Sequence, residues 1–124
     1  MKRYDPDKTP NPADWLAGDE QERLDVVSSY HRRAGVRVPS LQGHATLHVI
    51  VENQLATPEP AVVATLERLQ REGLTRHAAI HAIGSVLLEH LNWLMQQAEP
   101  APEPNARYFN NLEKLTAAGW LASS

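Results

Sequence analysis

The chain has 124 residues, a length that is enough for one hydrophobic core of modest size. Its 12 basic and 15 acidic residues give a net charge of −3, and only 6% of residues are aromatic, so we expect no nucleic-acid partner and no membrane attraction. No apolar run reaches the roughly 18 residues of a transmembrane helix, and the absence of cysteine excludes disulfides, thiolate catalysis and iron–sulfur clusters.

Residues 1–12 predict an extended arm, because they contain three of the nine prolines and few apolar side chains. This charged start does not resemble a signal peptide, so we expect a cytoplasmic protein. Helical spacing of apolar residues begins near Asp14 and continues to residues 35–39, which we interpret as a connector. Gly18 is a candidate break within this stretch, and Asp19 is a candidate N-cap for its second part.

Cap residues and apolar stripes predict three further helices, at about 40–56, 57–72 and 75–98. Ser40 and Thr75 are candidate N-caps. An acidic, proline-rich linker follows at 99–104, and a last helix is predicted over 105–124. No segment alternates polar and apolar residues as a half-buried strand would.

These elements predict an all-α fold, a four- to five-helix bundle over residues 13–98 that is flanked by the arm, the linker and the C-terminal helix. An internal similarity supports repeated architecture: the segment 43–50 reads GHATLHVI, and the segment 76–83 reads RHAAIHAI. Both segments open a predicted helix, and a short helix lies between them. The sequence therefore indicates a duplicated helical hairpin.

Two histidine pairs form the strongest candidate site, His44 with His48 and His77 with His81. Residues four apart lie on one face of a helix about one turn apart, so both imidazoles of a pair can reach the same ion. Glu52, four residues after His48, adds a carboxylate on that side as ligand or base. Two such helices facing each other would bind a transition metal, zinc or iron or manganese, rather than calcium or magnesium.

Two polar neighbours extend this candidate site. Asn53 is a candidate to orient a ligand, and its alternative is a solvent-facing position. Arg76 is a candidate to hold Glu52 in an ion pair across helices, which would make the cluster a polar network without a metal.

The remaining two histidines are not part of these pairs. We expect His31 to be a solvated cation near a helix end, where positive charge suits the helix dipole, and its alternative is to join the site. His90 lies well off the face that His77 and His81 share, so we exclude it from the ligand set.

The histidine segments resemble an uncharacterised bacterial family of unknown function. The resemblance rests on HATLHVIVENQL from His44 and RHAAIHAIG from Arg76, together with PADWL from Pro12 and YHR from Tyr30, and it covers about residues 4–95. It implies a small bacterial cytoplasmic protein whose histidine, glutamate, asparagine and arginine residues form one site, and it brings no known activity.

A looser likeness connects the chain with helical metal bundles of the hemerythrin and DinB-like kind, which place histidines and carboxylates on facing helices. The histidine spacing here differs from the hemerythrin ligand pattern, and few interior carboxylates are present to bridge two metals. A mononuclear site is therefore favoured over a di-iron site.

Three functions follow from these patterns. The first is a metal-binding protein in which an open coordination position activates water for hydrolysis, with Glu52 as base. The second is a non-catalytic interaction module, in which the His/Glu/Arg cluster is a buried polar network and the arm and C-terminal helix bind a protein partner or a second copy. The third is a metal-free enzyme that uses histidine and Glu52 as acid and base on a small molecule.

Overall fold

The computed structural model describes residues 3–34 and 41–123 of the chain. The chain forms two compact units, Met1–Glu59 and Pro60–Ser124. Both are built from helices, and the described residues contain no strand. Within this described part, no helix is both long enough and apolar enough to cross a bilayer.

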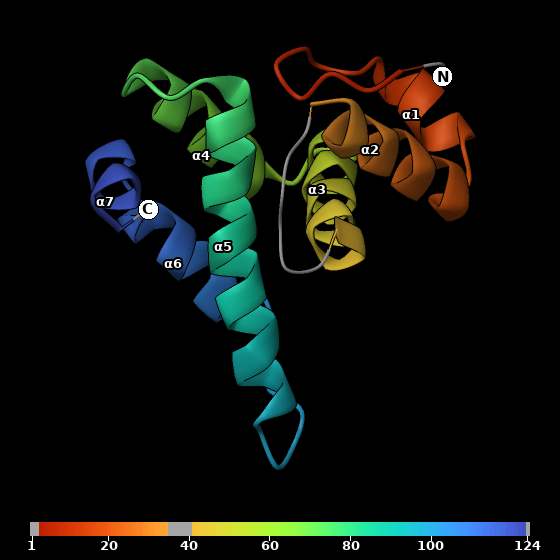
Figure 1. The fold of residues 1–124 in the computed structure, drawn as a ribbon. Helices are drawn as coiled ribbons and strands as arrows, with labels where there is room; N and C mark the ends of the chain where they lie inside the picture. Colours follow the sequence, from red (N-terminus) through yellow and green to blue (C-terminus); the bar gives the residue numbers. More distant parts are fainter. Residues whose placement is uncertain (1–2, 35–40, 124) are drawn as a thin grey trace. The chain divides into compact units, whose positions relative to one another are not determined.

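The described residues of the first unit form three helices, α1 (Pro12–Ala17), α2 (Glu20–Ala34) and α3 (Leu41–Ala56) (Figure 1). The side chain of Asn11 caps α1 by accepting a hydrogen bond from the Asp14 amide at 3.1 Å. Pro12 occupies the first helical position, where a backbone amide has no partner within the helix, so the missing N–H of proline costs nothing there. Asp19 accepts from the Glu22 amide at 2.9 Å and so caps α2. Gly18 therefore separates two helices.

The hydrophobic core of the first unit joins the arm to all three helices. Its buried members are Tyr4, Trp15, Val27, Ala45 and Val49. Trp15, from the short helix α1, is completely buried, and α3 packs against both α1 and α2. Burial of a large indole ring is what holds so short a helix in place.

A polar cluster fastens α1 and α2 to α3. The Asn53 Oδ1 atom accepts hydrogen bonds from the Trp15 indole at 2.8 Å and from the Arg23 guanidinium at 3.2 Å. The same guanidinium donates to the carbonyls of Trp15 and Leu16, each at 3.0 Å, and thus pairs the last carbonyls of α1.

The second unit contains four helices, α4 (Pro60–Arg71), α5 (Arg76–Met95), α6 (Ala106–Lys114) and α7 (Ala117–Ser123). The helix α6 packs against both α4 and α5 (Figure 1). Gly73, with a φ of 110°, ends α4, because the amide of the next residue, Leu74, can then bond back to the Leu69 carbonyl at 3.1 Å. Thr75 caps α5 by accepting from the Ala78 amide at 3.1 Å.

The predicted all-α class is confirmed, but the described residues form seven helices rather than four or five. The stretch from Asp14 onward divides at Gly18, and the predicted helix 105–124 divides between Lys114 and Ala117. Residues 3–11 contain no helix, while the predicted connector 35–39 and the candidate cap Ser40 lie outside the described residues. The boundary between the two units falls inside the segment 13–98 that the sequence groups as one bundle.

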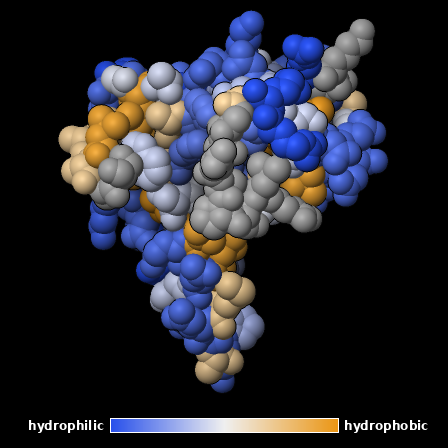
Figure 2. Space-filling view, in the orientation of Figure 1, coloured by the Kyte–Doolittle hydropathy of each residue, from blue (hydrophilic) through white to orange (hydrophobic). Residues whose placement is uncertain are grey.

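The surface in Figure 2 is largely hydrophilic, with hydrophobic residues in small groups. Among the residues whose burial is described, the exposed large hydrophobic side chains are Leu16, Leu88, Met95 and Leu121. Met95, at the end of α5, is the most exposed of the four, at 77%.

The Asn53 cluster yields a prediction about stability. Replacing Asn53 with alanine leaves the indole of Trp15 and the guanidinium of Arg23 without their shared acceptor, so we expect a loss of about 1–3 kcal/mol of unfolding free energy. Chemical denaturation followed by tryptophan fluorescence measures this loss. Gln21→Ala is the control, because the Gln21–Asp25 hydrogen bond is exposed, and we expect its effect to stay within about 0.5 kcal/mol. Equal stability of the two variants would refute a structural role for Asn53.

Candidate metal centre

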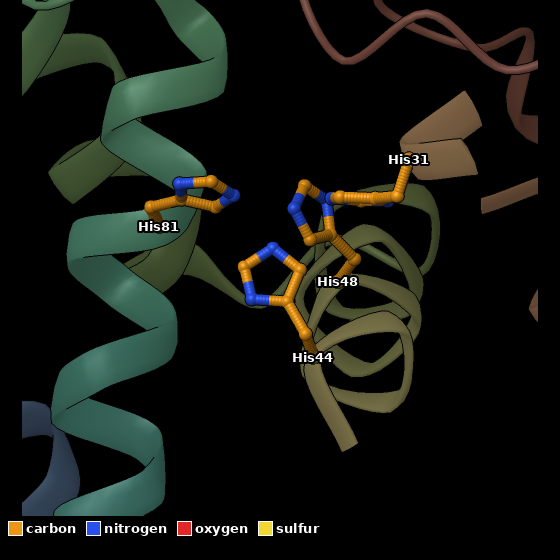
Figure 3. A group of neighbouring side chains, drawn as sticks. All are labelled: His31, His44, His48 and His81. Atoms are coloured by element: carbon orange, nitrogen blue, oxygen red, sulfur yellow. The ribbon is translucent and has the colours of Figure 1, made fainter. Parts of the chain in front are cut away.

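Three histidines of the first unit converge on one point (Figure 3). The ring centroid of His31 lies 4.6 Å from that of His44 and 4.7 Å from that of His48, and the last two centroids are 5.0 Å apart. One ring nitrogen from each residue lies within 4.8 Å of the other two. We call these three residues the histidine triad; their spacing suits the coordination of a single ion.

The packing of α2 against α3 creates the triad. His44 and His48 lie four residues apart near the start of α3, so they share a face of that helix. His31 lies four residues after the buried Val27 on α2, and so lies on the side of α2 that faces the core.

His31 has a defined tautomer. Its ring is completely buried, and its Nδ1 atom lies 2.8 Å from the Val27 carbonyl oxygen. A carbonyl oxygen only accepts, so Nδ1 must carry the proton and donate it. In the neutral ring the lone pair is then on Nε2, which is the atom available to a metal.

His48 is held by a chain of two hydrogen bonds. The Tyr4 hydroxyl donates to Glu52 Oε2 at 2.5 Å, and its oxygen lies 3.2 Å from His48 Nδ1. A phenol has one proton, and it is engaged with the carboxylate. His48 Nδ1 therefore donates to the Tyr4 oxygen, and the His48 Nε2 atom carries the lone pair.

Glu52 contacts Tyr4, and its role as ligand or base stays a prediction. It is buried, with an exposed fraction of 2%, and it is not a member of the group of metal-ligating atoms. Its carboxylate instead accepts the hydroxyl of Tyr4, one step removed from His48.

The two predicted neighbours of the site, Asn53 and Arg76, lie in different units. Asn53 binds Trp15 and Arg23, as described above. Arg76 is buried in the first turn of α5, in the second unit. An ion pair between Arg76 and Glu52 stays a prediction.

The second histidine pair belongs to the second unit. The Nε2 atoms of His77 and His81 are 3.0 Å apart on α5, so one imidazole can donate to the other, and both rings face a common point. Both residues are half-buried. His81 is also labelled in Figure 3. The prediction that this pair shares an ion with His44 and His48 stays a prediction.

The expectation for His31 was wrong. It is a fully buried member of the triad rather than a solvated cation, because its place on α2 relative to Val27 puts it on the core side of the helix. The four-residue spacing between Val27 and His31 is the feature of the sequence that indicates a buried His31. Tyr4 was also missed, since a single tyrosine in a proline-rich arm gives no periodic pattern.

His90, which the sequence excludes from the ligand set, lies in the second unit. Its ring is buried and stacks on Trp93 and Tyr108 at centroid distances of 5.9 and 5.5 Å. It is not in the group of metal-ligating atoms found among the described residues.

The charge environment of the triad includes the arm. Burial raises the pKa of Tyr30, whose ring packs at 5.2 Å on the ring of His31, and the nearby carboxylates of Asp7 and Asp5 raise it further. The acidic side chains of the arm thus lie close enough to α2 to influence its end electrostatically.

No family model, no curated protein and no solved structure matches this chain. The assignment of the site therefore stands on its geometry. Three imidazoles without a thiolate form a donor set of borderline softness, of the kind that first-row transition metals bind.

The hydrogen bonds of the triad predict its tautomers. In metal-free protein at a pH where the rings are neutral, we expect both His31 and His48 to carry the proton on Nδ1. Long-range proton–nitrogen correlation spectra distinguish the two ring nitrogens directly. In Tyr4→Phe, the His31 tautomer should persist and the His48 tautomer should change. Protonation of Nε2 in the wild-type His31 ring would contradict the geometry.

Proposed function

We propose that this protein binds one transition-metal ion through His31, His44 and His48. A single observation supports the proposal most strongly: one nitrogen from each of three imidazoles lies within 4.8 Å of the others, and two of the rings are almost completely buried. Burying three polar rings against one another is costly unless their polar atoms are engaged.

The directions of the hydrogen bonds favour a cation over a purely polar network. The Nδ1 protons of His31 and His48 point away, toward the Val27 carbonyl and the Tyr4 hydroxyl. Each neutral ring therefore keeps its lone pair on Nε2. A bound cation can accept the lone pairs of both rings.

The number of protein ligands decides what the ion does. Three imidazoles leave one position of a tetrahedral ion, and a water there would have its pKa lowered to about 7, as hydrolysis requires. We propose that a ligand from His77 or His81 fills this position, on the strength of the repeated sequence motif. The site would then be closed, with a structural or storage role, and the hydrolytic alternative would need the position to stay open.

The interaction module is the second candidate function. The Tyr4–Glu52–His48 hydrogen bonds are the observation that favours it, since they already form a polar network without a metal. Few large hydrophobic side chains are exposed among the residues whose burial is described, so an apolar docking surface gains little support.

The metal proposal predicts the effect of removing ligands. Protein purified without an affinity tag should contain close to one equivalent of zinc, iron or manganese by elemental analysis. His44→Gln, His48→Ala and His31→Ala should each lose most of it, because an incomplete coordination sphere binds weakly. His44 is half-buried, so His44→Gln is the variant least disturbing to the fold.

His90→Ala is the matched control, since it removes a histidine that lies outside the triad. Its metal content should equal that of wild type. His81→Ala reports on the fourth ligand: it should lose metal in a closed site and should retain it in an open one. Full metal content in His48→Ala would show that the ligands are wrongly assigned, and wild type that binds no zinc, iron or manganese would favour the interaction module.

Protons should compete with the metal. An imidazole ordinarily titrates near pH 6.5 and cannot coordinate once it is protonated, so we expect metal affinity to fall as the pH drops below about 6. Titration with zinc in the presence of a chromophoric chelator at several pH values measures this fall. An affinity that does not change between pH 7 and 5 would be inconsistent with imidazole ligands.

A further inference from the structure

We propose that Tyr4 is a positioning residue of the metal site, and that docking of the N-terminal arm and binding of the metal strengthen each other through it. This inference rests on the metal binding proposed above. It assigns to the arm a regulatory role at the site.

Tyr4 is buried although it lies in a segment without regular structure. Its exposed fraction is 2%, and residues 3–11 contain no helix or strand. Its ring packs on those of Trp15, Tyr30 and His48, with centroids 5.9, 6.1 and 6.0 Å away. A phenylalanine ring would make the same contacts, so these ring contacts alone do not require a hydroxyl.

The hydroxyl connects a buried carboxylate to a proposed ligand. It donates to Glu52 at 2.5 Å and lies 3.2 Å from His48 Nδ1. Histidines that bind metals usually donate their second ring proton to a carboxylate, which fixes the ring and makes the ligating nitrogen more basic. Here the carboxylate acts through Tyr4. The relay consists of three residues, His48, Tyr4 and Glu52.

The arm around Tyr4 is folded rather than extended. The Lys8 amide donates to the Asp5 carbonyl at 3.0 Å, the Asp7 amide donates to the Asp5 carboxylate at 3.0 Å, and Pro6 is buried. Lys8 itself is exposed. The arm is therefore a short docked turn whose contact with the site is made by the Tyr4 side chain.

Thermodynamic linkage makes the effect mutual. If the docked arm increases metal affinity by a given factor, the bound metal increases the docking equilibrium of the arm by the same factor. Loss of the hydroxyl must therefore weaken both. Arm docking and metal binding give two separate measurements of one coupling.

The first test is Tyr4→Phe, which retains the ring and removes only the hydroxyl. We expect zinc affinity, measured by competition with a chelator, to fall roughly 10- to 100-fold, as for other partners of ligating histidines. Tyr108→Phe is the matched control, because Tyr108 is also 2% exposed but belongs to the second unit; its zinc affinity should equal that of wild type. Glu52→Gln supplies a second variant, with the acceptor charge removed and Tyr4 intact, and should also weaken zinc binding.

The second test follows the arm. Trypsin can cleave after the exposed Lys8, and zinc should slow this cleavage in the wild type but much less in Tyr4→Phe. Circular dichroism establishes that each variant is folded. If wild type binds zinc and Tyr4→Phe binds it equally tightly, the role of Tyr4 is overturned while the metal proposal stands. If wild type binds neither zinc, iron nor manganese, both proposals fail together.

Discussion

The contact between α2 and α3 is the one on which the candidate site depends, because it buries an imidazole from α2 against two from α3. Polar rings in such a place must be satisfied by hydrogen bonds or by a cation. Groups outside the triad supply hydrogen bonds to two of its rings. The Val27 carbonyl accepts from His31, and the Tyr4 hydroxyl oxygen accepts from His48. The positions of the ring protons of His31 and His48 are thus set by the backbone and by the arm.

Stability and binding are coupled in such an arrangement. An ion that binds only the folded state would stabilise the first unit by mass action. Asn53 and Glu52 are adjacent in sequence but serve different purposes. Asn53 fastens α1 and α2 to α3, whereas the Glu52 carboxylate accepts the hydroxyl of Tyr4.

Apolar periodicity and caps predict most of the helices of this protein, because both depend on local sequence. The pair His44 and His48 follows from helix geometry in the same way. His31 was misplaced because its position was interpreted from the helix dipole rather than from its spacing to Val27. Tyr4 could not be predicted, since its role depends on tertiary contacts of the arm with α3. The division into two units was likewise hidden, because the residues at the boundary near Pro60 carry the same turn signals as a helix–helix connection within one bundle.

The triad and its supporting tyrosine all lie among the first 48 residues of the sequence, and His31 precedes His44 by only 13 positions. The contact between His31 and His44 closes a short loop at small entropic cost, whereas the contact between Tyr4 and His48 spans 44 residues. Synthesis proceeds from the N-terminus, and compact units generally fold as they emerge. All three imidazoles of the triad therefore enter the growing chain before the second unit does.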